Sequence, residues 1–155
     1  MKKEIYLILH NIRSLHNVGS IFRTADCAGV KKIFLTGYTP APVDIFGKTK
    51  NEIKKTALGA ERTIDWEKYK DIGKLILKLK KQKIKIIALE QSQNSINYKK
   101  FRPEFPLALI VGNEVRGISK QILKKCDNTV EIPVAGKKES LNVAVAAGII
   151  LFELN

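Results

Sequence analysis

The sequence is poor in several residue types, and each shortage excludes a class of protein. Its 155 residues include only two cysteines, Cys27 and Cys126, too few for a disulfide framework or for a four-ligand zinc site. Both fall in stretches that favour helix, so we expect reduced, buried thiols. No apolar run approaches the roughly 20 residues that span a bilayer, and the apolar run after Glu4 is too short for a signal peptide. We therefore expect a cytoplasmic protein that makes no contact with a membrane.

Acidic residues are also scarce. The chain has 15 Asp and Glu against 28 Lys and Arg, which leaves a formal net charge of +13. A polyanionic partner explains this excess better than solubility does, and nucleic acid is the first candidate. Only five basic residues are arginine. Arginine offers a planar fork for phosphate, whereas lysine is a hydrated point charge, so the scarce arginines are candidates for a functional site.

The sequence does contain enough apolar material for a core, because 45% of its residues are hydrophobic and a chain of this length buries roughly two thirds of its unfolded surface. Short apolar runs predict strands at 5–9, 33–35, 84–89, 107–111 and 130–132. Helical patterns with candidate caps lie between them, from Asn17 to Ala28, Asp65 to about Gln82, Ser119 to about Cys126, and about Ser140 to the C-terminus. This alternation indicates an α/β fold, with a mostly parallel sheet and flanking helices, in a single domain over residues 1–155.

Loops after the carboxyl ends of parallel strands are where α/β proteins bind ligands. The first such segment, 10–26, contains neither G-x-G-x-x-G nor G-x-x-x-x-G-K-[ST], which argues against a dinucleotide fingerprint and a P-loop. Taken alone, it is typical of a helix capped by Asn17, with an exposed Arg23 that pairs with Asp26.

Two further segments follow predicted strands. In 107–119 a buried strand runs into Gly-x-Glu-x-x-Gly, which places the carboxylate of Glu114 between two residues that permit tight turns. In 130–147 Pro133 closes a strand, and Ser140, Leu141 and Asn142 open a helix of small residues. We do not expect Ser140 to be a hydrolytic nucleophile, because the chain lacks G-x-S-x-G and offers no His near it.

Taken in order, the three segments resemble the three motifs of the SpoU (TrmH-like) branch of the SPOUT RNA methyltransferases. They read N-x-G-x-x-x-R-T-A-D over 17–26, I-V-G-x-E-x-x-G-I over 110–118 and I-P-x-x-G-x-x-x-S-L-N-V over 132–143. The resemblance spans nearly the whole chain. It implies a C-terminal deep trefoil knot, a homodimer, and transfer of a methyl group from S-adenosyl-L-methionine (AdoMet) to a ribose 2′-hydroxyl of tRNA or rRNA.

The resemblance also implies where the cofactor binds. AdoMet would lie among backbone groups of three loops, at Leu89, at Gly112 and from Ile132 through Ser140 and Leu141. Backbone groups between aliphatic side chains are a reasonable adenine site on physical grounds as well. The reaction requires no metal, and the sequence contains no His, Cys and carboxylate cluster with metal spacing.

The catalytic roles follow from the same resemblance. Arg23 would contact the ribose hydroxyl with help from an RNA phosphate, and its permanent charge favours positioning and phosphate clamping over action as a base. Asn17 and Asn142 would orient Arg23 and the ribose. Glu114 would fix the cofactor loop or a dimer contact, and Ser140 would hydrogen-bond near the cofactor or the arginine.

We expect no RNA-binding extension, so the domain itself must bind RNA. The lysine-rich stretch 74–85 and Lys48, Lys50, Lys54 and Lys55 could supply phosphate contacts, although 74–85 is equally typical of a solvated helix face. Aromatic residues for stacking on bases are few, and Tyr38 and Phe46 lie in an irregular segment near a possible site rim.

Two other classes of function remain open. A non-catalytic basic RNA-binding module would explain the charge but not the motif set. A small-molecule α/β enzyme with a nucleotide cofactor would explain the loops but not the charge.

Overall fold

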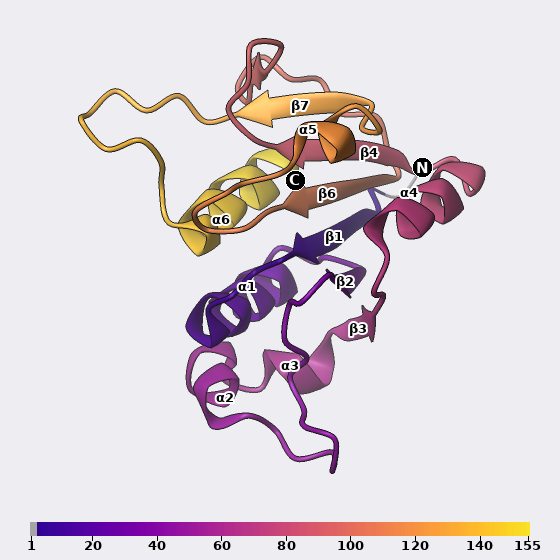
Figure 1. The fold of residues 1–155 in the computed structure, drawn as a ribbon, viewed down its shortest axis with the longest axis vertical. Coiled ribbons are helices and arrows are strands. Elements are labelled where there is room, and N and C mark those ends of the chain that lie inside the picture. The colour runs from indigo at the N-terminus through magenta and orange to yellow at the C-terminus, as the bar shows by residue number, and fades with distance from the viewer. Residues whose placement is uncertain (1–2) are drawn as a thin grey trace.

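The computed structural model describes residues 3–155 and contains one seven-stranded sheet (Figure 1). The order of strands across the sheet is β3-β2-β1-β6-β4-β7-β5, and every neighbouring pair is parallel. The strands are β1 (Ile5–His10), β2 (Lys32–Thr36), β3 (Asp65–Lys68), β4 (Lys85–Leu89), β5 (Ile96–Asn97), β6 (Leu107–Val111) and β7 (Asn128–Glu131). The expected α/β fold is confirmed.

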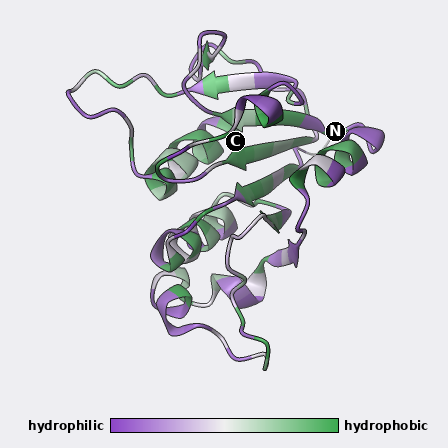
Figure 2. Cartoon of the chain, in the orientation of Figure 1, coloured by the Kyte–Doolittle hydropathy of each residue, from purple (hydrophilic) through white to green (hydrophobic). Residues whose placement is uncertain are grey.

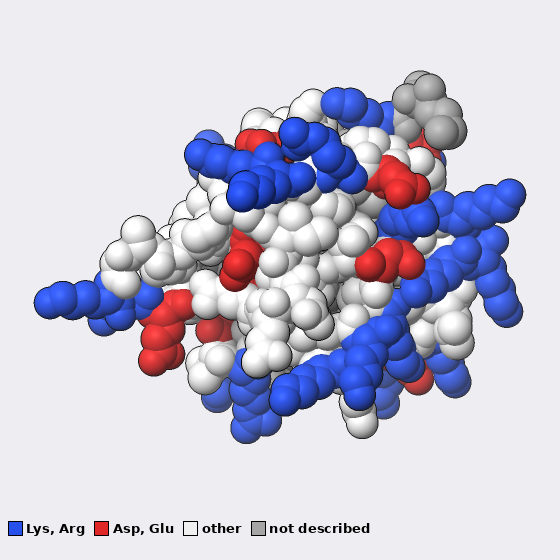
Figure 3. Space-filling model, turned by 90° about the horizontal axis from the view of Figure 1, so that it is seen from above, with Lys and Arg blue, Asp and Glu red and all other residues white. Residues whose placement is uncertain are grey.

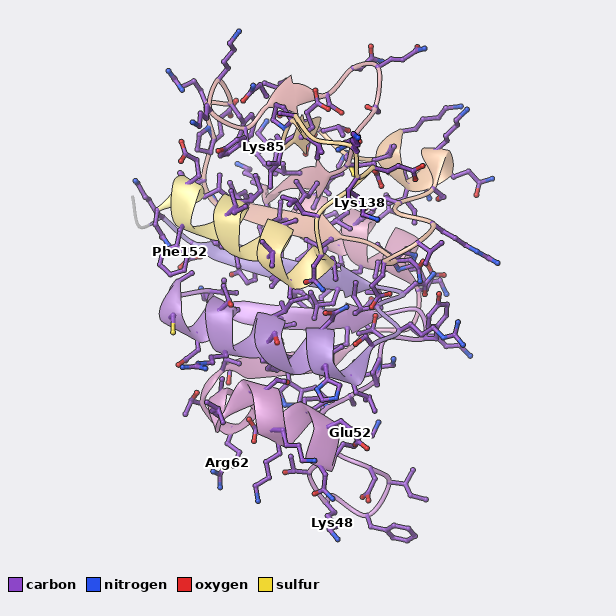
Figure 4. The ribbon with its side chains drawn as sticks, turned by 90° about the vertical axis from the view of Figure 1, so that its left-hand side faces the viewer. Lys48, Glu52, Arg62, Lys85, Lys138 and Phe152 are labelled. Carbon is purple, nitrogen blue, oxygen red and sulfur yellow. The ribbon has the colours of Figure 1, made fainter. Side chains whose placement is uncertain are left out.

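Helices cover both faces of the sheet. They are α1 (Leu15–Cys27), α2 (Asn51–Ala57), α3 (Ala60–Thr63), α4 (Ile72–Lys81), α5 (Lys120–Leu123) and α6 (Val143–Leu154). Helix α1 packs against α2, α3 and α6, and Figure 1 shows α4 on the other side of the sheet from α1 and α6. Seen from the side, α6, α1 and α2 lie one above the next (Figure 4).

The two faces of the sheet bury separate apolar clusters because side chains alternate along each strand. In β1, Leu7 and Leu9 face α1 and α6, whereas Ile8 faces the cluster that contains α4. Helix α4 buries Ile72, Leu75, Ile76 and Leu79 and turns its lysines to solvent. Figure 2 shows the central strands as the most continuous hydrophobic part of the chain.

Four predicted helix boundaries are corrected. Helix α1 is capped by Ser14, whose side chain accepts from the N–H of Asn17, so Asn17 lies in the first turn. Asp65 begins strand β3, and the cap of α4 is Asp71, which accepts from Lys74 N. Ser119 caps α5 as expected, but that helix ends at Leu123. The last helix starts at Val143, and Asn142 caps it, with Ser140 in the preceding loop.

The prediction of buried thiols is wrong for Cys27, which is exposed at the end of α1. Cys126 is half-buried and follows α5, and burial raises the pKa of its thiol to about 11. The expectation that both thiols lie inside helices therefore fails at Cys126.

The resemblance also implied a C-terminal knot, which stays a prediction. Within the described part of the chain, no helix has both the length and the apolar character needed to cross a membrane.

Candidate active site

A cavity of about 940 Å³ lies where the loops after β4, β6 and β7 meet. The volume is within the range typical of small-molecule and cofactor sites. All five residues predicted to bind the cofactor line it, and so does Glu114; the five are Leu89, Gly112, Ile132, Ser140 and Leu141. Apolar walls and exposed backbone from three loops are the surroundings expected for an adenine nucleoside.

Glu114 joins the second motif to the first. Its carboxylate accepts hydrogen bonds from the N–H groups of Arg13 (3.1 Å) and Ser14 (3.0 Å) and from the side-chain amide of Asn17 (3.3 Å). Partial burial alone would raise the pKa of Glu114, but these donors and its own backbone N–H outweigh that effect and hold the pKa below its ordinary value. The carboxylate is therefore ionised at neutral pH and fastens the loop after β6 to the start of α1.

Asn17 extends this connection to the third motif. Its Oδ1 accepts a hydrogen bond of 3.1 Å from Nδ2 of Asn142. Asn142 in turn accepts at Oδ1 from the N–H groups of Ala144 and Val145 and so caps α6. The three motifs, far apart in sequence, thus meet in one chain of hydrogen bonds through Glu114, Asn17 and Asn142.

The loop after β6 is held tightly by its glycines and by a second carboxylate. A Cβ at Gly112 would lie 2.6 Å from Ile118 Cγ1 and 2.8 Å from Gly117 O, so no other residue fits there. At the far end of the loop, Glu90 accepts from the N–H of Ile118 (2.8 Å) and packs against Gly117. The sequence did not point to Glu90. The one feature that could have done so is Gly117, the second glycine of the motif, because its missing side chain leaves room for the Glu90 carboxylate.

Asn113 is a second positioning residue that the sequence did not reveal. Its Nδ2 donates to Asn11 O and to the hydroxyl of Tyr38, both at 2.9 Å. Its Oδ1 accepts from the N–H groups of Val115 (2.9 Å) and Arg116 (2.8 Å). The amide therefore uses two donors and two acceptors to fix three loops at the carboxyl edge of the sheet.

Arg23 lies apart from this cavity. It is exposed on α1 and lines a shallow hollow together with Ser20, Thr24, Cys27, Lys55, Thr56 and Phe152. The expected pair with Asp26 is absent; Asp26 instead accepts from Thr63 Oγ1 (3.3 Å). Among residues 3–155, no group accepts a hydrogen bond or salt bridge from the guanidinium of Arg23, which leaves its planar fork available for a ligand.

The other predicted phosphate contacts are spread over the surface. Seen from above, Lys and Arg side chains fringe the molecule, with a few acidic residues among them (Figure 3). Within the stretch 74–85, Lys80 pairs with Asp127 and Lys85 with Glu104. In the part of the chain that the structure describes, no group of three or more His, Cys, Asp or Glu could hold a metal ion.

The fold and the cavity together define a parallel α/β protein with a cavity large enough for a nucleoside at the carboxyl edge of its sheet. Residues 4–152 match the SpoU rRNA Methylase family, and the chain belongs to that family. The resemblance found in the motifs is therefore confirmed.

Relatives in the family are named RNA methyltransferases. The chain is 32% identical to the tRNA (guanosine(18)-2′-O)-methyltransferase of Aquifex aeolicus over 98% of its own length and 69% of that protein. It is 31% identical to the 23S rRNA (guanosine-2′-O-)-methyltransferase RlmB of Ralstonia nicotianae over 96% of its length and 57% of that relative.

The fold agrees with solved structures. The AdoMet-bound rRNA methyltransferase of Sinorhizobium meliloti matches with a TM-score of 0.87 at 28% identity, over 99% of this chain and 56% of that one. The TrmH/SpoU tRNA modifying enzyme of A. aeolicus matches with a TM-score of 0.84 at 29% identity, over 99% of this chain and 74% of that one.

Proposed function

We propose that this protein transfers a methyl group from AdoMet to a ribose 2′-hydroxyl of tRNA or rRNA. The observation that supports the proposal most strongly is that side chains from all three motifs are joined by hydrogen bonds. Glu114, Asn17 and Asn142 are linked by hydrogen bonds beside a cavity lined by all five predicted cofactor residues. The family match and the names of the relatives support the same activity.

The cavity suits AdoMet. Leu89, Ile132 and Leu141 would enclose the adenine, while backbone groups near Gly112 and the hydroxyl of Ser140 offer hydrogen bonds. When bound, AdoMet supplies an electrophilic methyl group. The protein then has to align the ribose hydroxyl and to accept its proton.

Arg23 is the proposed positioning group for that hydroxyl. Its side chain is exposed and unpaired among the described residues, and a guanidinium can bind a phosphate through two parallel N–H donors. Asn17 and Asn142 would orient the ribose. Glu114 would hold the first loop against the cofactor loop, which the three hydrogen bonds to its carboxylate support.

We infer further that the active unit is a homodimer. Arg23 does not line the cofactor cavity of its own chain, so a single chain leaves the proposed site incomplete. Helix α6 is apolar nearly throughout and still exposes Val145 (52%) and Phe152 (56%) beside α1. Pairing through α1 and α6 would bury these side chains and could bring Arg23 of one subunit to the cavity of the other.

The RNA would be bound by the domain over residues 1–155 itself, in the cytoplasm. The net charge of +13 supports an RNA partner, because lysines that neutralise phosphates release counterions. The chain spans 57% to 69% of the length of the relatives named above.

A non-catalytic RNA-binding module of the same fold is the alternative, and cofactor binding separates the two. We expect isothermal titration calorimetry to show binding of AdoMet and of its demethylated product in the presence of a chelator, since no group of side chains within residues 3–155 could hold a metal ion. A folded sample that gives no heat with either ligand at millimolar concentration would favour the binding module.

A further inference from the structure

Residues 43–49, between β2 and α2, form a short hairpin that projects from the body of the protein. Val43 and Thr49 pair as an antiparallel bridge, and Asp44 N donates to Lys48 O at 2.9 Å. Oδ1 of Asp44 also accepts from the N–H groups of Phe46 (2.9 Å) and Lys48 (3.0 Å). Gly47, with φ of 80°, closes the turn. The backbone of this hairpin is therefore ordered by its own hydrogen bonds.

The tip of the hairpin presents two large apolar side chains to solvent. Ile45 is 93% exposed and Phe46 is 87% exposed. The tip is a hydrophobic segment at the end of the molecule beyond α2 (Figure 2), and Lys48 lies there in the side view (Figure 4). Folding gains almost nothing from these side chains, so an ordered turn that displays them is best explained by a ligand.

The surroundings of the tip are basic. Lys48 lies in the hairpin, Lys50 follows it at the N-cap of α2, and Lys54 and Lys55 lie in that helix. Within residues 3–155, none of these lysines forms a salt bridge, although Glu52 is also exposed. Burial, and after it the charge of Lys50, lowers the pKa of Lys68, so Lys50 lies near one further lysine on β3. An aromatic ring among unpaired lysines favours single-stranded nucleic acid, whose bases stack while its phosphates pair with cations.

The hairpin is also coupled to Arg23. Helices α1 and α2 approach so closely at Gly19 that a Cβ there would lie 2.6 Å from Ile53 O and would collide with Thr56. Lys55 and Thr56 of α2 line the same hollow as Arg23. Helix α2 has seven residues and is therefore about 10 Å long. A strand that passes Arg23 and follows α2 would reach the tip within a few nucleotides.

We propose that Phe46, flanked by Ile45, is a stacking platform for an unpaired base of the RNA, close in sequence to the ribose held at Arg23. This inference rests on the proposed function for the identity of the ribose, but the platform itself is testable by binding alone. With this platform, the hairpin would bind RNA loops and single strands in preference to duplexes, because a base inside a duplex has no free face to stack on Phe46.

The test uses fluorescence and affinity on the full chain. Trp66 is the one native tryptophan, so Phe46→Trp in a Trp66→Phe background places a single reporter at the tip. We expect its emission to be quenched by a single-stranded oligouridylate and not by a duplex of the same length. Phe46→Ala should weaken the oligouridylate affinity by about tenfold, and Phe46→Tyr should restore it. Leu77→Ala, which truncates another exposed apolar side chain on α4 (59%), should leave it unchanged.

Three results would contradict the stacking platform. The first is an unchanged oligouridylate affinity of Phe46→Ala, and the second is an equal loss of affinity for duplex and single strand in that variant. The third is a change in the sedimentation of Phe46→Ala, which would show that the tip contacts protein. These outcomes are separable from failure of the proposed function. If the wild-type protein binds single strands through Phe46 but never methylates them, the methyltransferase activity is refuted and the stacking platform stands. If Phe46→Ala methylates RNA fully and binds it with unaltered affinity, the platform is refuted and the methyltransferase activity stands.

Discussion

Arg23 illustrates how little a single residue can contribute to folding while being central to the proposed chemistry. It stands on the solvent side of α1, and its neighbour Asp26 bonds to Thr63 instead. An exposed helical arginine without a partner contributes well under about 1 kcal/mol to stability. Its place beside Lys55 in a hollow is better explained by a phosphate than by the fold.

We expect Arg23→Ala to reduce methyl transfer to RNA nearly to zero while AdoMet affinity stays within a few fold, because the cofactor cavity does not include Arg23. Lysine should not rescue the loss, since a point charge cannot replace the planar fork. Single-turnover rates, calorimetry and melting temperatures of both variants measure this. Wild-type turnover in Arg23→Ala, or a loss explained by unfolding, would contradict the assignment.

Glu114 should make stability depend on pH. Its pKa is lower in the folded protein than its ordinary value of 4.5, so its contribution is complete above that value and is lost as the pH falls through the folded pKa. Glu114→Gln should therefore lower the free energy of unfolding by roughly 1 kcal/mol at neutral pH, and the difference from wild type should shrink in acid. Urea unfolding at several pH values measures it; a difference that is constant from neutral to acidic pH would argue against this role.

Among the secondary-structure elements, the strands were predicted well from the apolar runs, because a buried parallel strand needs a continuous run of branched apolar residues. β6 was predicted with its observed bounds of Leu107–Val111. β3 was missed because Asp65-Trp66-Glu67-Lys68 forms a polar strand at the sheet edge, and β5 because it has two residues. Helix starts were less predictable, since Ser14 and Asn17, or Asp65 and Asp71, are equally good caps and only tertiary packing selects one.

The candidate site was predictable in part. The hydrogen bonds that link Glu114, Asn17 and Asn142 were not predicted. The five residues that line the cavity, and the presence of these three side chains at one site, were predictable from the resemblance of the three segments. Glu90 and Asn113 were not, because their hydrogen bonds join backbone groups from loops that only the folded sheet brings together. The separation of Arg23 from the cavity was not predictable either, since it depends on which side of α1 faces the sheet.

Helix α6 should determine the oligomeric state. Val145→Asp places a charge in the exposed apolar surface of α6 and should convert a dimer, about twice 17.4 kDa, to a monomer in sedimentation at micromolar concentration. The monomer should still bind AdoMet but lose methyl transfer, because the proposed site takes Arg23 from the second subunit. Leu77→Asp on α4 is the matched control and should remain dimeric. A monomer with full activity would contradict the dimeric site.

The lysines that give the molecule its net charge of +13 do not all have the same proposed role. The lysines of α4 lie across the sheet from α1 and α6 (Figure 1), and some of the stretch 74–85 is already paired with acidic residues. Lys55 of α2 lines the hollow that contains Arg23, and Lys48, Lys50 and Lys54 precede it in the hairpin, at the N-cap of α2 and within α2. We therefore assign phosphate contacts near the reacting ribose to the hairpin and α2, with α4 contributing long-range attraction.

Methylation of a ribose 2′-hydroxyl of RNA with AdoMet is the proposed activity of the protein. To test it, the purified protein is incubated with methyl-labelled AdoMet and total RNA from cells that lack it, the RNA is digested with nuclease, and the labelled nucleotide is mapped. We expect label at one or a few positions of a tRNA or rRNA, in a 2′-O-methyl nucleotide, and none with Arg23→Ala. Label on a base, or no label from a protein that binds AdoMet, would contradict it.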